Sequence, residues 1–407
     1  MMRIEKIKNI LMDARNNVPF YAGIIPEHMD ALTNDEIVHS FSQIPPTDKD
    51  NIREDYSKFV SKHICGELVK RAEYERRIGR EEHSQIDNCE YVFEYTSGSS
   101  GTPFVTVKTL NERFLLAKAL WSARNNLISI RATEAFNCNN PSSPLVNIEN
   151  LIKNDYDMWM VNVNRLETIK KYCEINDTRL SKLKLIENAG SFITVEEQFA
   201  YEKFFNCIVS NYYGCTETWG IAYSCKNKNL HIMEDSVYVE LLDENDNVIE
   251  ENGRVGTVTV TSYILRQMPF IRYKTGDLAY YMPEKCECSN LRKVIRLVPN
   301  RNMILGTNLY GNNYFRGVLL KLIAEYKINK FKNISIMQTG LKTFDVNVTG
   351  CLVDKAALES GFNMAAKTVF QRDDYEFFFH YGQETVGKNI FTLSPYLLKR
   401  GSYPWKN

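Results

Sequence analysis

The sequence predicts an α/β protein with a large N-terminal domain of α/β sheets, a β-rich subdomain within it, and a small α+β C-terminal domain. Three observations lead to this prediction. Strand-like runs that end in turns alternate with helical segments between residues 183 and 214, which is typical of a partly parallel sheet. Strand-like runs joined by Asp, Asn and Gly turns then fill the middle of the chain. After residue 299 the composition changes again, and paired strand patterns precede one helix.

Helices are expected near the N-terminus, and two segments that contain proline indicate where helical structure is interrupted. Apolar residues recur at helical spacing over residues 4–17, and the helix should end before Pro19, because the residue that precedes a proline disfavours helical geometry. The loop 44–49 contains two prolines, and a polar helical stretch follows it. A long helix is expected over residues 111–130.

The α/β core is predicted from a strand over 183–190, a helix over 194–205 and a strand over 207–214. Strands of the β-rich subdomain are expected at 236–242, 254–261 and 293–298.

The C-terminal domain is predicted from alternating patterns over 334–339, 344–349 and 375–381, with a helix over 354–370 that Asp354 would cap. We therefore expect a domain over residues 1–301, with its β-rich part at about 225–300, and a second domain over 302–407.

Composition excludes several classes of protein. The chain has 407 residues, too many for one core, and its 44% hydrophobic and 25% charged residues are ordinary for a globular protein. Lys+Arg 50 against Asp+Glu 50 gives no net charge and hence no nucleic-acid signature. No apolar run is long enough to span a membrane, and the N-terminus lacks a signal-peptide core, so we expect a cytoplasmic protein. Its ten cysteines are then expected to be thiols or metal ligands.

A run of hydroxyl and glycine residues spans Tyr95 to Pro103. Glycines let the backbone pass close to a ligand, and successive N–H groups and hydroxyls fit a phosphate. A surface turn explains the run equally well when it is taken alone. The candidate phosphate ligands are Thr96, Ser97, Gly98, Ser99, Ser100, Gly101 and Thr102.

Three later turns carry groups suited to a nucleotide. The turn 213–217 ends in a carboxylate, which suits Mg²⁺, although a helix cap would explain it too. In the turn 272–278, Asp277 follows a glycine and can accept both ribose hydroxyls, or is a solvated aspartate of a type II turn. The small residues 189–191 would let a flat base approach, or form an ordinary turn.

The order of these four motifs resembles that of the adenylate-forming ligases, and most closely the phenylacetate–CoA ligase branch. The stretches 18–21 and 44–49 are also similar to that branch, and the similarity extends to residue 388. It implies the adenylate-forming enzyme fold, with a mobile C-terminal domain. It also implies that ATP and Mg²⁺ activate a carboxylic acid as an acyl-adenylate, whose acyl group passes to a thiol, most simply that of CoA.

The resemblance also implies roles for single residues. The loop would surround the ATP β- and γ-phosphates, Glu217 would hold Mg²⁺, and Asp277 would bind the ribose. Ala189, Gly190 and Ser191 would border the base, with Tyr213 nearby, and Gly214 is also expected to bind the cofactor. Arg301 resembles the arginine that opens the hinge between the domains. The predicted catalytic residues are Lys388, which would meet the α-phosphate and the acyl carboxylate, Thr216 and Glu217.

Two positions depart from the family pattern. Thr102 stands where the loop commonly has a lysine, and Asn302 stands where the hinge commonly has an acidic residue. Three functions therefore stay open: a CoA ligase for an aromatic or similar acid, a ligase that loads the phosphopantetheine arm of an acyl carrier protein, and a weakened ligase-like binding or scaffolding protein. We expect a small acid as substrate, no nucleic-acid or membrane partner, and leave a homodimer open.

A second site is suggested by four possible metal ligands. Cys225, His231, Cys286 and Cys288 supply three thiolates and an imidazole, the set that a structural, tetrahedral Zn²⁺ takes. Ordinary thiols and a histidine at a strand start explain the same residues, so both interpretations stay open.

Overall fold

The computed structural model describes most of the chain. The residues described are 2–73, 81–95, 104–128, 135–137, 152, 154, 156–161, 163–190, 192–298, 315, 318, 319, 321–323, 325–331, 333–339, 342–370, 373–382 and 391–393. The described residues form two compact units, one up to Val298 and one from residue 315 onward, and each is described by itself.

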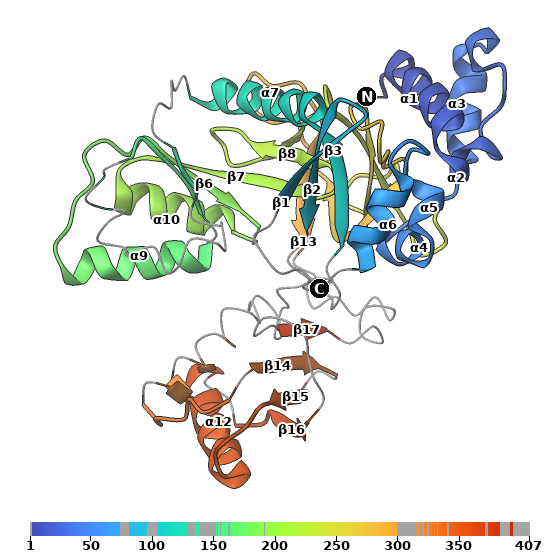
Figure 1. Cartoon of the computed structure of the whole chain (residues 1–407). Helices are drawn as coiled ribbons and strands as arrows, with labels where there is room; N and C mark the ends of the chain where they lie inside the picture. Colours follow the sequence, from blue (N-terminus) through green and yellow to red (C-terminus); the bar gives the residue numbers. More distant parts are fainter. Residues whose placement is uncertain are drawn as a thin grey trace. The chain divides into compact units, whose positions relative to one another are not determined.

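The first unit is built on a mixed ten-stranded sheet in the order β10-β11-β12-β13-β9-β8-β7-β6-β5-β4 (Figure 1). Strands β4, β5, β6 and β7 pair in parallel with one another. Every other neighbouring pair in this sheet, from β7–β8 to β11–β10, is antiparallel. The strands are β4 Ala135–Asn137, β5 Met158–Val161, β6 Leu185–Ala189, β7 Ile208–Cys215, β8 Trp219–Ser224, β9 Leu230–Ile232, β10 Val237–Leu242, β11 Gly256–Ser262, β12 Tyr273–Tyr281 and β13 Val294–Val298. Because β13 pairs with β9, the expected β-rich region continues the same sheet.

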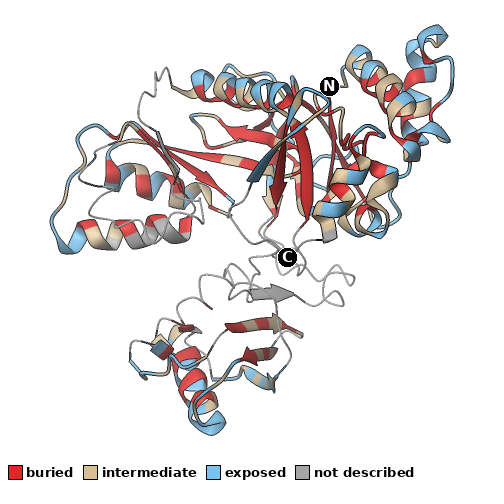
Figure 2. Ribbon diagram, in the orientation of Figure 1, coloured by how far each residue is buried: buried red, intermediate tan, exposed pale blue. Residues whose placement is uncertain are grey.

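In the described part of the chain, the helices α7 Leu110–Leu127, α9 Val163–Ile175 and α10 Val195–Phe205 accompany this sheet. Thr109 and Glu112 form a capping box at the start of α7, and Thr194 and Glu197 form another at α10. The long helix was expected over 111–130, and the structure places its end at Leu127. The predicted α/β class is thus confirmed, and its buried residues concentrate on the strands (Figure 2).

The N-terminal segment adds short helices and a second sheet. Its helices are α1 Ile4–Asn17, α2 Pro19–Ala22, η1 Met29–Ala31, α3 Asn34–Ser42, α4 Lys49–Glu54, α5 Tyr56–Phe59 and α6 Cys65–Glu73. Strands β1 Glu81–Ile86, β2 Cys89–Tyr95 and β3 Val105–Thr109 form an antiparallel sheet. Asp87 and Asn88, both at positive φ, make the tight turn between β1 and β2, a hairpin that the sequence analysis missed.

The second unit contains a four-stranded sheet in the order β16-β15-β14-β17 and the helix α12 Lys355–Phe370. Its strands are β14 Asn333–Gln338, β15 Thr343–Thr349, β16 Glu376–Tyr381 and β17 Phe391–Leu393. β14 and β15 are antiparallel, as paired patterns predicted, and the Asp354 carboxylate accepts a hydrogen bond from the Ala356 N–H at the start of α12. Two parallel pairings, β15 with β16 and β14 with β17, complete the sheet.

Candidate functional site

The two strands that flank the Ser/Gly run form the base of the candidate site. Tyr95 at the end of β2 pairs with Val105 at the start of β3, so the run joins neighbouring strands. Lys108, fully buried on β3, donates hydrogen bonds to the Glu94 carboxylate (2.7 Å), the Thr106 hydroxyl (2.9 Å) and the Thr216 carbonyl (2.9 Å). The base of the run is therefore tied to the segment that contains Thr216.

That segment is the tip of a β-hairpin, which corrects the sequence analysis. Gly214 and Cys215 lie within β7, and residues 216–218 turn into β8, so the alternative of a helix that starts there is wrong. Gly214 sits at a register shift where an added Cβ would lie 2.3 Å from the Trp219 carbonyl oxygen. Only glycine permits this close approach of two backbones.

Glu217 at this tip is a buried carboxylate with two close partners. Its side chain is 2% exposed, its Oε1 accepts a 2.9 Å hydrogen bond from the Tyr273 hydroxyl, and the Lys49 ammonium lies 3.0 Å from the same oxygen. Burial alone would raise the pKa of Glu217, but Lys49 and the hydrogen bonds outweigh burial and hold this pKa below its usual value. Glu217 is therefore held in its ionised form, whose oxygens are of the kind that a divalent cation prefers.

Asp277 lies inside strand β12, where a turn was expected. β12 places three residues, 275–277, opposite one residue of β11, because its register shifts between Thr257 and Thr259, and Gly276 has φ +78° in this bulge. The Asp277 carboxylate accepts a 3.1 Å hydrogen bond from the Tyr213 hydroxyl. The bulge thus directs Asp277 toward Tyr213 on β7, the first strand of the hairpin.

Ala189 and Gly190 mark the end of β6, and Gly190 has φ +77°, with nothing within 4 Å of an added Cβ. Directly before them, the Glu187 carboxylate accepts hydrogen bonds from Arg124 (2.6 and 2.8 Å) and the Tyr223 hydroxyl (2.8 Å), all buried. This buried polar group was missed, although a glutamate in the middle of the strand Leu185–Ala189 was a signal for it.

The remaining predicted site residues lie outside the described part of the chain. They are Thr96, Ser97, Gly98, Ser99, Ser100, Gly101, Thr102, Ser191, Arg301 and Lys388, together with Asn302. Their roles stay predictions. Lys49, Glu94 and Lys108 were not predicted as site residues, and the signal for Lys108 was a lysine that alternates with the valines of β3.

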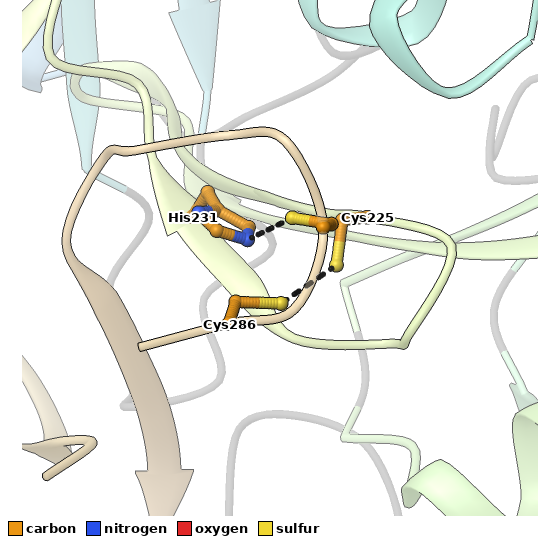
Figure 3. Close-up of side chains that lie close together, drawn as sticks. Cys225, His231 and Cys286 are labelled. Carbon is orange, nitrogen blue, oxygen red and sulfur yellow. Dashed lines mark hydrogen bonds between the residues drawn. The ribbon is translucent and has the colours of Figure 1, made fainter. Parts of the chain in front are cut away.

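The four predicted metal ligands come together in space. Among the described residues, the ligand atoms of Cys225, His231, Cys286 and Cys288 lie within 4.8 Å of one another. Figure 3 shows Cys225, His231 and Cys286 of this cluster close together. Cys225 Sγ is 3.6 Å from Cys286 Sγ, and Cys288 Sγ is 3.2 Å from His231 Nε2. Zn–S bonds of about 2.3 Å place two sulfurs of a tetrahedral site about 3.7 Å apart. The spacing therefore suits zinc.

Contacts around the cluster also suit a metal. His231 Nδ1 lies 3.0 Å from the Arg292 carbonyl oxygen, which favours a proton on Nδ1 and leaves Nε2 as the ligand. Asn229 donates a 3.2 Å hydrogen bond to Cys286 Sγ. Burial alone would raise the pKa of Cys286, but hydrogen bonds, that of Asn229 first among them, lower it to about 6. This thiol thus offers a thiolate near neutral pH.

Comparison with known proteins identifies the fold. Crystal structures of 2-hydroxyisobutyryl-CoA ligase with 2-HIB-AMP and CoA in the thioesterification state, and with 2-HIB-AMP in the postadenylation state, match 98% of this chain and 90% of theirs. Their TM-scores are 0.60 and 0.59, at 12% and 13% sequence identity. The open form of that ligase gives a TM-score of 0.56. The chain has the fold of the adenylate-forming CoA ligases.

Sequence comparison finds similarity over a smaller part of the chain. A phenylacetate-coenzyme A ligase of Thermus thermophilus is 31% identical over 111 residues, 25% of this chain and 24% of that protein. The chain therefore matches only about a quarter of this relative's length. No protein-family model matches. Together, the CoA-ligase fold and this stretch confirm the predicted resemblance.

No helix among the described residues has both the length and the apolar character that crossing a bilayer requires.

Proposed function

We propose that the protein is an ATP-dependent acid–thiol ligase, which converts a small carboxylic acid into an acyl-adenylate and transfers the acyl group to CoA. One observation carries the proposal: Lys108 joins Glu94, beside the base of the Ser/Gly run, to the hairpin tip that contains Glu217, and Tyr213 of the same hairpin contacts Asp277. The stretch similar to a phenylacetate-coenzyme A ligase supports the same chemistry.

The reaction has two steps. An oxygen of the acid attacks the ATP α-phosphorus, the bond to the β-phosphate bridge breaks, and pyrophosphate leaves. The thiolate of CoA then attacks the carbonyl carbon, and AMP leaves with the former carboxylate oxygen. Phosphoryl transfer of this kind depends on positioning and on neutralising anionic charge, so the site needs no protein nucleophile.

The residues have distinct roles in this proposal. Asp277 accepts hydrogen bonds from the ribose, and Thr216 contacts the phosphate or the acyl carboxylate. Lys108 holds the hairpin tip against the base of the Ser/Gly run, which would keep the phosphates between them. Lys388 would meet the α-phosphate.

Glu217 fits a magnesium ligand, because it is ionised, offers oxygen, and lies at the hairpin tip. Mg²⁺ is usually held by one or two carboxylates together with substrate phosphates and water, so a single protein carboxylate is sufficient. When bound, the ion neutralises phosphate charge.

The Cys/His cluster fits a structural zinc, since four protein ligands leave no open coordination position. We expect purified protein to contain about one zinc per chain. Elemental analysis tests this, with Cys286→Ser as the variant that loses the metal and Cys351→Ser as the matched control. Equal zinc in wild type and Cys286→Ser would exclude the site.

Pyrophosphate release tests the activity. The protein is incubated with Mg·ATP, hydroxylamine and a panel of aryl and alkyl acids, so that the preference for an aromatic acid is measured in the same experiment. CoA and a holo acyl carrier protein are then offered as acceptors. Transfer to the carrier alone would favour the second function. No release with any acid would favour a weakened, ligase-like binding protein.

Two variants identify the residues. Glu217→Gln should lower acid-dependent pyrophosphate release about a hundredfold, since a buried ligand charge is lost. Lys388→Ala should lose most adenylation while ATP binding persists, and unchanged activity would mean that another lysine acts there. A cytosolic location, a homodimer and the domain boundary at residue 301 stay predictions.

A further inference from the structure

We propose that Lys49 is a phosphate-binding cation of this site, held on Glu217 until a divalent cation takes that carboxylate. The inference rests on the proposed function. It concerns the last residue of the stretch 44–49, far in sequence from Glu217.

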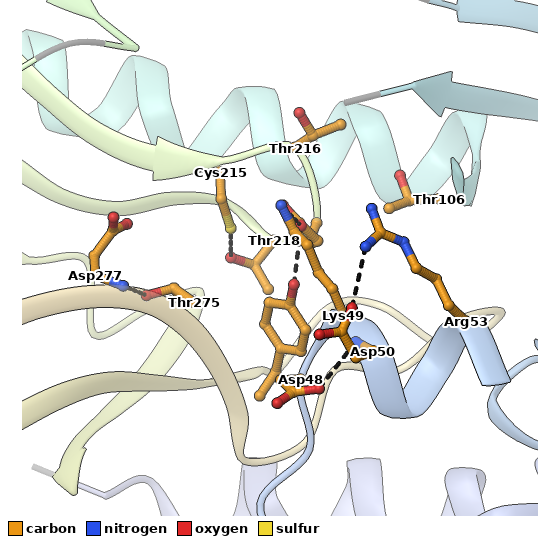
Figure 4. Close-up of polar contacts among 12 residues, drawn as sticks. Asp48, Lys49, Asp50, Arg53, Thr106, Cys215, Thr216, Thr218, Thr275 and Asp277 are labelled. Carbon is orange, nitrogen blue, oxygen red and sulfur yellow. Dashed lines mark hydrogen bonds and ion pairs between the residues drawn. The ribbon is translucent and has the colours of Figure 1, made fainter. Parts of the chain in front are cut away.

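The backbone fixes where Lys49 enters the site. The Thr47 N–H donates to the Arg272 carbonyl (3.1 Å), and the Lys274 N–H donates to the Thr47 carbonyl (2.7 Å), so residue 47 forms a parallel bridge with β12. The Asp48 carboxylate then accepts hydrogen bonds from two backbone N–H groups, those of Asp50 (2.9 Å) and Asn51 (3.0 Å). Lys49 is thereby anchored beside the strand that carries Tyr273 and Asp277 (Figure 4).

Lys49 and Glu217, the two members of the ion pair, differ in how freely their side chains can move. The Glu217 side chain is 2% exposed and also accepts the Tyr273 hydroxyl, so it cannot leave its position without breaking buried contacts. The Lys49 side chain is 23% exposed and has a flexible stem, so its ammonium can change partner by rotation of side-chain bonds. Any rearrangement of the pair therefore moves Lys49.

Charge decides when this rearrangement occurs. A divalent cation on Glu217 would share its carboxylate with an ammonium, and the two positive charges would repel each other at this range. ATP brings phosphate oxygens with the cation, and these accept the displaced ammonium in charge-assisted hydrogen bonds.

ATP binding with and without Mg²⁺ tests the inference, measured by calorimetry on the full chain. Lys49→Met should weaken Mg·ATP binding about tenfold or more, while AMP binding and ATP binding in EDTA stay within about twofold of wild type. Lys49→Arg keeps the charge and should retain most of the affinity. Lys58→Met, which removes an exposed lysine of the same segment, is the matched control.

The metal-free condition separates this role from a purely structural one. Glu217→Gln frees Lys49 without a metal, so ATP binding in EDTA should tighten about threefold or more, and Lys49→Met/Glu217→Gln should lose that gain. Equal losses of ATP and AMP affinity in Lys49→Met, no loss of either, or no gain in Glu217→Gln would overturn the inference. If the wild type does not bind ATP at all, the proposed function itself fails.

Discussion

Lys108 provides the sharpest stability prediction, because its whole side chain is buried. Lys108→Met keeps the aliphatic stem but removes three hydrogen bonds and the positive charge beside Glu94. Removing one partner of a buried ion pair costs about 3–5 kcal/mol. Glu94 keeps Arg113 at 3.1 Å and the Trp219 indole N–H at 3.0 Å, so we expect the lower end, about 3 kcal/mol.

Urea unfolding followed by tryptophan fluorescence measures this loss, since Trp121, Trp159 and Trp219 all lie in the first unit. Lys58→Met removes a lysine that is 62% exposed and lies 3.4 Å from Asp55, and should cost less than about 1 kcal/mol. A Lys108→Met protein no less stable than Lys58→Met would refute the reasoning.

Three further predictions concern other parts of the first unit. Arg124→Met should destabilise the protein by about 3 kcal/mol in urea unfolding, because it leaves the buried Glu187 carboxylate without its cation. Adding Glu187→Gln removes that charge and should restore part of the loss, and no recovery would argue against a stabilising Arg124–Glu187 ion pair. Gly214→Ala should lower the thermal midpoint or prevent folding, since its Cβ would meet a carbonyl oxygen at 2.3 Å, whereas Gly66→Ala, with nothing within 4 Å of the new Cβ, should be tolerated. Burial raises the pKa of Asp13 above 3.8, so ionisation opposes folding and this carboxyl's contribution to stability falls as the pH rises above 3.8. Asp13→Asn should therefore be more stable than wild type at pH 7, with a gain that shrinks toward pH 3.8; a constant gain would exclude this cause.

Much of the fold could be predicted where local signals and long-range packing agree. Apolar spacing located α1, and the helix predicted over 194–205 is α10. The strand–helix–strand alternation predicted the parallel pairing of β6 and β7. These signals depend on residues that are close together along the chain, so they can be read from the sequence alone.

Other features depend on contacts between distant segments. Gly276 indicated a turn, but pairing on the β11 side makes residues 273–281 one strand with a bulge. Gly214 indicated a turn too, but pairing with β8 places it inside strand β7, and the turn follows at residues 216–218. The Lys49–Glu217 pair joins residues 168 positions apart (217 − 49), through a bridge that has no signature in the sequence. The Cys/His cluster is the exception, because ligand chemistry identified residues that only the fold brings together.

ATP–pyrophosphate exchange tests the central claim most directly, because it reports acyl-adenylate formation without needing the acceptor thiol. Labelled pyrophosphate is incubated with the protein, Mg·ATP and each acid of the panel. We predict label in ATP that depends on an acid and on Glu217, with little exchange in Glu217→Gln. Folded protein that binds Mg·ATP but shows no exchange with any acid would contradict the account.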